Sequence, residues 1–338
     1  MTRFPARTYA RIADLTLEIA DYELERLEAD VTRDFTRVTT LVRLKADGEE
    51  GLGEDVTWYT EAHDREQAAG PSRRLGGTWT LESFSEALDI DEPHRRWAYE
   101  SAALDLALRQ AGASLADTLG RTRRPVTFVV SPGLGDPPSA DVLRRRLEIY
   151  PDLRFKLDPG DAWTDQLVAG LAETGAVDIV DFKAFYSADA APPDIVLYRR
   201  VVDGFPRAWL EDPALTTETD EVLLPHRDRI TWDAPIHSVA DVERLAFAPR
   251  TLNVKSSRFG FLHELLDFYD YCAERDIGLY GGGMFELGAG RGQIQYLASL
   301  FHADAPNDVA PSGFNEREPR PGLPASPLPT PGNEPGFR

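Results

Sequence analysis

The second half of the chain repeats one pattern, in which a short apolar run is followed by an amphipathic segment. Short apolar runs are typical of buried parallel strands, and the amphipathic segments between them are typical of covering helices. The runs lie at residues 126–131, 153–157, 177–183, 208–211, 230–233, 252–255, 278–283 and, weakly, 309–312. This alternation predicts an α/β fold, a TIM-type (β/α) barrel of seven or eight strands. An open doubly wound sheet is the alternative, but no glycine-rich phosphate-binding turn follows the first run.

The two ends of the chain follow other patterns. Residues 11–46 alternate apolar and polar side chains, as antiparallel strands with one solvated face do, and residues 93–119 have helical spacing. We therefore expect an N-terminal α+β capping domain over residues 1–118 and the barrel over 119–316. Residues 317–338 contain seven prolines, so this tail is expected to be extended or disordered.

Composition restricts the partners and the compartment. The formal net charge of -20 argues against binding to nucleic acid, which requires a basic surface. Cys272 is the single cysteine, so neither an intrachain disulfide nor a cysteine-based zinc site can form. The sequence contains neither the apolar core of a signal peptide nor a run of about 18 apolar residues that could span a bilayer. We expect a cytoplasmic protein without nucleic acid or membrane partners.

Lysine is scarce and unusually placed. Only four of the 37 basic residues are lysines, and Lys156, Lys183 and Lys255 lie inside or at the end of apolar runs. Arginine stays protonated in proteins, whereas the pKa of a lysine amine can be shifted far enough for it to act as an acid or base. Codon bias and chance could also produce this distribution. We favour the interpretation that these lysines are functional.

Acidic and basic residues end five successive strand candidates. Asp181, Glu211 and Asp233 end three of them, and Lys156 and Lys255 end the strands on either side. In a parallel barrel these ends open on one face, so we expect the five side chains to share a site. Three carboxylates suit Mg²⁺, with Mn²⁺ possible, and the cation would stabilise an enediolate formed from a carboxylate substrate. Taken singly, each acid also has a structural interpretation, such as pairing of Asp181 with Lys183.

Several motifs together resemble the enolase superfamily, and within it the muconate-lactonising (muconate cycloisomerase) subgroup. They are Gly-Leu-Gly-Glu at 51–54, Arg-Phe-Lys at 154–156, Trp-Leu-Glu-Asp-Pro at 209–213, Trp-Asp at 232–233 and Asn-Val-Lys-Ser-Ser-Arg-Phe-Gly at 253–260. The resemblance implies that Asp181, Glu211 and Asp233 are metal ligands, that Lys156 and Lys255 are the catalytic acid/base pair, and that the protein is a homo-oligomer.

The chain also departs from the family pattern. Arg154 replaces a common lysine, and Lys183 stands where asparagine is common, which leaves the role of Lys183 open. The seventh strand candidate has no histidine at its end, and the eighth lacks the Asp-x-Asp pair of dipeptide epimerases. Dipeptide epimerisation is therefore disfavoured. The side chains that we expect to contact substrate are Arg154, Lys183, Tyr59, Met284 and Glu286.

The resulting hypothesis is a divalent-metal-dependent enzyme that abstracts the α-proton of a small-molecule carboxylate. It could be a cycloisomerase, a dehydratase like o-succinylbenzoate synthase, or an N-acyl amino acid racemase. Two alternatives stay open from the sequence. One is a metal-free Schiff-base lyase or aldolase that uses one of the strand-end lysines as nucleophile. The other is a barrel that has lost its chemistry and acts as a binding protein.

Overall fold

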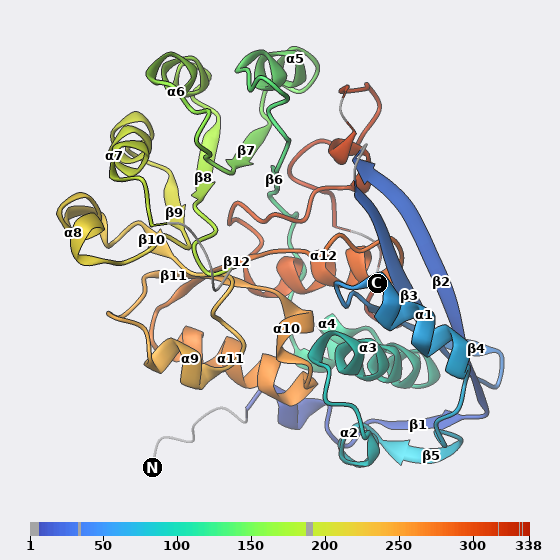
Figure 1. Cartoon of the computed structure of the whole chain (residues 1–338). Helices are drawn as coiled ribbons and strands as arrows, with labels where there is room; N and C mark the ends of the chain where they lie inside the picture. The colour runs from blue at the N-terminus through green and yellow to red at the C-terminus, as the bar shows by residue number, and fades with distance from the viewer. Residues whose placement is uncertain (1–6, 33–34, 187–191, 317, 331, 333) are drawn as a thin grey trace.

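Five parallel strands form the larger sheet in the second half of the chain (Figure 1). The computed structural model describes residues 7–32, 35–186, 192–316, 318–330, 332 and 334–338. In spatial order the five strands are β6 (Val129–Val130), β7 (Arg154–Leu157), β8 (Val177–Asp181), β9 (Trp209–Glu211) and β10 (Ile230–Thr231). A second parallel pair consists of β11 (Thr251–Val254) and β12 (Gly278–Gly281).

Backbone hydrogen bonds join these two sheets into a ring. The Asn253 amide donates to the Trp232 carbonyl at 3.0 Å, which links β11 to the end of β10. On the other side, Asp308 donates to Gly281 and Val129 donates to Asn307, both at 2.8 Å. Residues 307 and 308 thus take the position of an eighth strand. The predicted α/β barrel fold class is confirmed.

The eighth strand is the least regular one. Pairing falls on residues 307 and 308 rather than on the predicted 309–312, and it is limited to isolated bridges. Pro311 has no amide hydrogen to donate to a neighbouring strand, so a longer pairing there is disfavoured.

Helices follow the strands and cover the outside of the ring (Figure 1). Phe155 and Val180 point outward and pack in a cluster that includes Leu143, Leu171 and Val201 of the covering helices. These helices are α5 (Asp141–Ile149), α6 (Asp165–Ala172), α7 (Ile195–Gly204), α8 (Thr217–Leu223), α9 (Val239–Glu243), α10 (Ser256–Phe259), α11 (Leu262–Glu274) and α12 (Ala289–Phe301), with short 3₁₀ turns at Leu224–His226 and Ser312–Asn315.

The N-terminal region packs a sheet against a long helix (Figure 1). The antiparallel sheet consists of β2 (Asp21–Thr32), β3 (Phe35–Ala46) and β4 (Glu49–Asp55), and the helix is α3 (Pro93–Gln110). The smaller elements are a 3₁₀ turn at Tyr9–Arg11, the antiparallel pair β1 (Thr16–Ile19) and β5 (Gly77–Thr80), α1 (Thr60–Ala69), α2 (Leu81–Ala87) and α4 (Leu115–Leu119).

Two glycines of β4 allow the backbone of α3 to approach closely. A Cβ atom on Gly51 would lie 2.1 Å from the Ala102 carbonyl oxygen, and one on Gly53 would lie 1.9 Å from the Ala98 carbonyl oxygen. No larger residue fits at either position without moving the helix. The Gly-Leu-Gly part of the 51–54 motif is thereby explained by packing.

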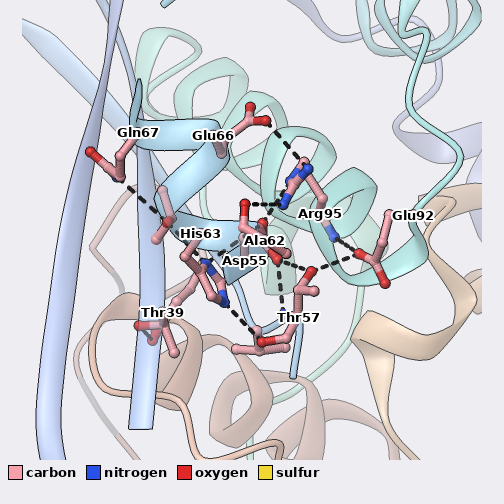
Figure 2. A network of polar contacts seen from close by, with 12 residues as sticks. Thr39, Asp55, Thr57, Ala62, His63, Glu66, Gln67, Glu92 and Arg95 are labelled. Carbon is pink, nitrogen blue, oxygen red and sulfur yellow. Dashed lines mark hydrogen bonds and ion pairs between the residues drawn. The ribbon is translucent and has the colours of Figure 1, made fainter. Parts of the chain in front are cut away.

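A buried polar network fixes the segment after β4, as Figure 2 shows. Asp55 accepts hydrogen bonds from the Thr57 hydroxyl at 2.5 Å and from Arg95 Nε at 2.8 Å. Arg95 also pairs with Glu66 of α1 at 3.3 Å, and His63 Nε2 contacts the Thr57 carbonyl at 2.8 Å. This network therefore joins β4, α1 and α3, and it positions residues 57–59 at the edge of the cap.

The described residues of the proline-rich tail lie along both domains. Leu328 forms an antiparallel bridge with Val126, just before β6. Farther along, Phe337 is fully buried, its amide donates to Asp105 Oδ1 at 3.1 Å, and Arg338 pairs with Asp105 Oδ2 at 3.2 Å. The tail thus connects the barrel to α3 of the cap.

In the part of the chain that the structure describes, no helix combines the length and the hydropathy needed to cross a membrane.

We expect Gly53→Ala to lower the free energy of unfolding by about 3 kcal/mol, because the added methyl group would overlap the Ala98 carbonyl. Gly133→Ala is the matched control, since nothing lies within 4 Å of the point that its Cβ atom would occupy and its φ is not positive. Chemical denaturation of both variants measures the difference. Equal losses of stability would contradict the proposed packing constraint.

Candidate active site

Three of the predicted site residues meet at the ends of β7, β8 and β9. Lys156 Nζ lies 2.6 Å from Glu211 Oε1 and 3.1 Å from Asp181 Oδ2. The Lys156 side chain is only 3% exposed, and both carboxylates are fully buried. These neighbouring parallel strands bring the three groups to one edge of the sheet, as their positions at strand ends predicted.

The other two predicted residues form a second cluster beside the first. Lys255 Nζ lies 2.8 Å from Asp233 Oδ2, and Arg258 Nη1 lies 2.7 Å from Asp233 Oδ1. Asp212, directly after Glu211, accepts hydrogen bonds from the backbone amides of Asp233 and Ala234, both at 2.8 Å. Asp212 thereby ties the end of β9 to the segment that carries Asp233.

Lys183 joins the site as a third ammonium group. Its Nζ lies 2.8 Å from Asp181 Oδ2 and 3.3 Å from Asp158 Oδ1. Asp181 therefore pairs with both Lys156 and Lys183. Its pairing with Lys183, the structural interpretation of this acid, does not remove it from the site. Lys183 has a φ of 54°, a left-handed conformation that is uncommon for a side chain of this kind.

The other side chains predicted to contact substrate have different partners in the structure. Arg154 pairs with Asp178 at the start of β8, at 2.5 and 3.0 Å, and β7 and β8 shift register between Phe155 and Lys156. At this shift β8 carries one residue more than β7, and Asp178 is the extra residue. Arg154 begins β7, two residues before Lys156, and its guanidinium is held there by Asp178.

The predicted contacts outside the barrel strands bond to other groups or are exposed. Glu286 accepts a hydrogen bond from the Met284 amide at 2.7 Å and pairs with Arg291 at 3.2 Å. Tyr59 is 70% exposed. Among the described residues, no hydrogen bond or ion pair joins Arg154, Tyr59, Met284 or Glu286 to the three predicted metal ligands.

Sequence reasoning missed several side chains that contact the predicted ligands. Tyr280 donates to Glu211 Oε2 at 2.7 Å, and Asn253 Nδ2 donates to Glu211 Oε1 at 3.3 Å. Strand alternation could have found Asn253, because it lies two residues before Lys255. Tyr186 donates to Asp233 Oδ2 at 2.7 Å from an irregular segment, and Asp308 lies 3.8 Å from Lys156 Nζ. No periodic pattern marks either of these two.

Burial and neighbouring charges shift the pKa values of the site residues in different directions. Burial raises the pKa of Glu211 to about 8, against the opposing effect of the Lys156 ammonium group. Burial alone would lower the pKa of Lys156, but Glu211 and Asp181 outweigh it and hold that pKa well above its usual value. For Asp233, burial is outweighed by Lys255 and Arg258, so its pKa is lowered. Lys156 is thus held protonated, and Glu211 holds its proton more tightly than an exposed glutamate does.

The donor set fits a hard divalent cation in its chemistry. The site contains six acidic and four cationic side chains. The acids are Asp158, Asp181, Glu211, Asp212, Asp233 and Asp308, and the cations are Lys156, Lys183, Lys255 and Arg258. Asn253 Oδ1 is also buried without a hydrogen-bond partner. Carboxylate and amide oxygens are preferred ligands of Mg²⁺.

In this structure these oxygens are not arranged around a common point as metal ligands are. Across the described ranges, no group of three acidic, histidine or cysteine side chains has the arrangement needed to hold a metal ion. Asp181, Glu211 and Asp233 instead contact the ammonium groups of three lysines. Cation binding would therefore have to replace some of these internal ion pairs.

Comparison with known proteins identifies relatives for the whole fold. Sequence models of the family described as Domain of unknown function (DUF8230) match residues 10–118 with the N-terminal domain and 122–316 with the C-terminal domain. An N-succinylamino acid racemase from Amycolatopsis is 29% identical over 331 residues, which cover 88% of this chain and 87% of that protein. An o-succinylbenzoate synthase from Bacillus subtilis is 30% identical over 226 residues, which cover 63% of this chain and 58% of that protein.

Solved structures agree with the fold. A muconate lactonizing enzyme superposes with a TM-score of 0.69 at 20% identity, covering 95% of this chain and 96% of that chain. An enolase superfamily member from Listeria innocua gives a TM-score of 0.66 at 21% identity, covering 88% and 86%. The fold that the resemblance to the enolase superfamily implied is confirmed.

The raised pKa of Glu211 predicts how the stability of the metal-free protein depends on pH. Its proton is bound more tightly in the folded state, so the stabilisation is complete below the ordinary glutamate pKa and is lost as pH rises through about 8. Relative to Glu211→Gln, we expect the free energy of unfolding of the unsubstituted protein to fall by roughly 2–4 kcal/mol between about pH 5 and pH 9. Denaturation at a series of pH values, with the exposed Glu148→Gln as control, measures this. Parallel curves for the unsubstituted protein and Glu211→Gln would refute it.

Proposed function

We propose that this chain, which belongs to the DUF8230 family and has the enolase superfamily fold, is a divalent-metal-dependent enzyme that abstracts the α-proton of a small-molecule carboxylate. The observation that carries the proposal is the position of Asp181, Glu211, Asp233, Lys156 and Lys255 at the ends of five successive barrel strands, in two neighbouring clusters of ion pairs. Buried carboxylates beside lysine ammonium groups suit this chemistry.

Asp181, Glu211 and Asp233 would hold the cation. When bound, it would polarise the substrate carboxylate, stabilise the enediolate and offset the negative charge that keeps Lys156 protonated. Tyr280 and Asn253 hold the two oxygens of Glu211 in place, and Asp212 orients the backbone of Asp233. These contacts would restrict where the ligands point.

Lys156 and Lys255 would transfer the protons. They extend from β7 and from the end of β11, on either side of the three acidic strand ends. A proton removed by one lysine could be returned by the other, which gives racemisation, or the enediolate could eliminate or cyclise. Lys156 contacts two buried carboxylates and is held protonated in the metal-free protein, so in this state it is the proton-donating member of the pair.

The relatives support a carboxylate substrate that carries an acyl or succinyl group. Their names include N-succinylamino acid racemase and o-succinylbenzoate synthase, so N-acyl amino acids and precursors of succinylbenzoate are the first candidates. The Schiff-base alternative gains no support. It requires a neutral amine, whereas despite burial the surrounding carboxylates raise the pKa of Lys183 to about 12 and hold the pKa of Lys156 well above its usual value.

We expect Lys255→Ala and Lys156→Ala each to reduce exchange of the substrate α-proton with D₂O by about a thousandfold, because each removes one proton-transfer group. Lys45→Ala is the matched control, since Lys45 pairs with Glu23 on the cap sheet. NMR on a panel of N-acyl amino acids and succinylbenzoate precursors follows the exchange. Full exchange by Lys255→Ala would exclude its assigned role.

Metal dependence gives a separate test. We expect Glu211→Gln to weaken Mg²⁺ binding at least ~10-fold, because it removes a charged ligand from a buried site. Asp178→Asn, which alters an acid paired with Arg154 away from the site, should leave binding unchanged. Calorimetry of the chelator-treated protein measures both affinities, and Mg²⁺ should restore the proton exchange that the chelator abolishes. Equal binding by the Glu211→Gln variant would remove Glu211 from the ligand set.

A further inference from the structure

Residues 183–186 form a turn between two of the proposed metal ligands. The Tyr186 amide donates to the Lys183 carbonyl at 3.3 Å, and the Ala184 amide donates to the Asp212 carbonyl at 3.1 Å. At its start, Lys183 Nζ pairs with Asp181; at its end, the Tyr186 hydroxyl donates to Asp233. The turn therefore connects the side chains at the ends of β8 and β10, past β9, which lies between them.

Tyr186 reaches a buried carboxylate from an exposed position. The residue is 50% exposed, whereas Asp233 is 1% exposed. Its hydroxyl donates to Asp233 Oδ2 at 2.7 Å and accepts a hydrogen bond from Arg258 Nη2 at 3.2 Å. The Lys183 ammonium group lies 5.3 Å from the centre of the tyrosine ring. The side chain thus enters the site from the solvent side.

The hydrogen bonds of Asp233 leave little capacity for another ligand. Oδ2 accepts from Lys255 at 2.8 Å and from Tyr186 at 2.7 Å, and Arg258 Nη2 lies 3.4 Å away. Oδ1 accepts from Arg258 Nη1 at 2.7 Å. A carboxylate oxygen has about two lone pairs, so Oδ2 is fully used. A cation at Oδ2 would have to displace one of these donors.

Tyr186 is the donor with the fewest constraints. Lys255 directly precedes α10 and Arg258 lies within it, and this helix packs against α3 through a contact of His94 Nδ1 with the Ser257 hydroxyl at 2.9 Å. Lys255 also passes Gly282 so closely that a Cβ atom there would lie 2.7 Å from Lys255 Cε. Tyr186 is half exposed, and the 183–186 turn that carries it belongs to no helix or strand.

We propose that Tyr186 is an internal competitor of the divalent cation at Asp233. Its hydroxyl occupies Oδ2 in the metal-free protein and withdraws when the cation binds, so that Tyr186 lowers the affinity of the site. The inference rests on the proposed function, because it takes Asp233 to be a metal ligand. Tyr186 is a positioning residue in this role and takes no part in the proton transfer.

Tyr186→Phe tests the competition, because it keeps the ring beside Lys183 and removes only the hydroxyl. A hydrogen bond to a charged group corresponds to about a tenfold change in affinity or more, so we expect Mg²⁺ to bind the variant about 10-fold more tightly. Calorimetry with Mg²⁺ alone on the chelator-treated full chain measures this without any turnover. Tyr150→Phe is the matched control, since its hydroxyl bonds the Arg320 carbonyl at 2.8 Å on the tail. Unchanged or weaker binding by Tyr186→Phe would overturn the competition.

A second measurement uses the unsubstituted protein. Withdrawal of the hydroxyl from Asp233 should give a tyrosine difference spectrum in the ultraviolet when Mg²⁺ is added, and Tyr186→Phe should lack it. If the spectrum is the same in both proteins, Tyr186 does not move and the proposal fails. This readout also serves if the variant is too unstable for calorimetry, with Tyr186→Leu as the replacement.

The two proposals can fail separately. If Glu211→Gln loses Mg²⁺ binding but Tyr186→Phe binds no more tightly than the unsubstituted protein, only the competition is refuted. Binding by Tyr186→Phe alone would support both the ligand set and the competition. If neither the unsubstituted protein nor Tyr186→Phe binds Mg²⁺, both the proposed metal site and its competitor are refuted.

Discussion

The buried pairing of Lys156 with Glu211 is the interaction on which the rest of the site depends. Charged groups out of water are costly unless they are paired and hydrogen-bonded. At 2.6 Å, with Tyr280 and Asn253 as further donors to Glu211, this pair meets that requirement. Removing Lys156 would take this ammonium group away from both Glu211 and Asp181, which are buried. The pair therefore links the stability of the barrel interior to the groups that would carry out the chemistry.

Much of this arrangement could be predicted from the sequence because barrel geometry relates strand ends to each other. Asp181, Glu211 and Asp233 follow apolar runs, and parallel neighbours bring such positions to one edge without further information. The sequence showed the glycines of β4 as part of a motif. Only the structure shows why they are glycines, namely that they contact the α3 backbone. Periodicity thus predicted the fold class and the groups that belong together.

The sequence could not supply what depends on irregular backbone. Alternation places Arg154 on the same face as Lys156, but it does not show that an extra residue on β8 brings Asp178 to Arg154 at the start of β7. Tyr186 lies in a segment with no period, and the pairing at residues 307 and 308 is too short to leave a pattern. The sequence also does not show which cationic side chain each acid contacts, because residue spacing does not determine the distances between these side chains.

The contact between β4 and α3 restricts how this cap can diverge during evolution. With carbonyl oxygens of α3 where the Cβ atoms of Gly51 and Gly53 would lie, the sheet can neither slide along the helix nor rotate on it. Sequence change in the cap of descendants of this chain would therefore exchange side chains on a scaffold whose framework stays in register.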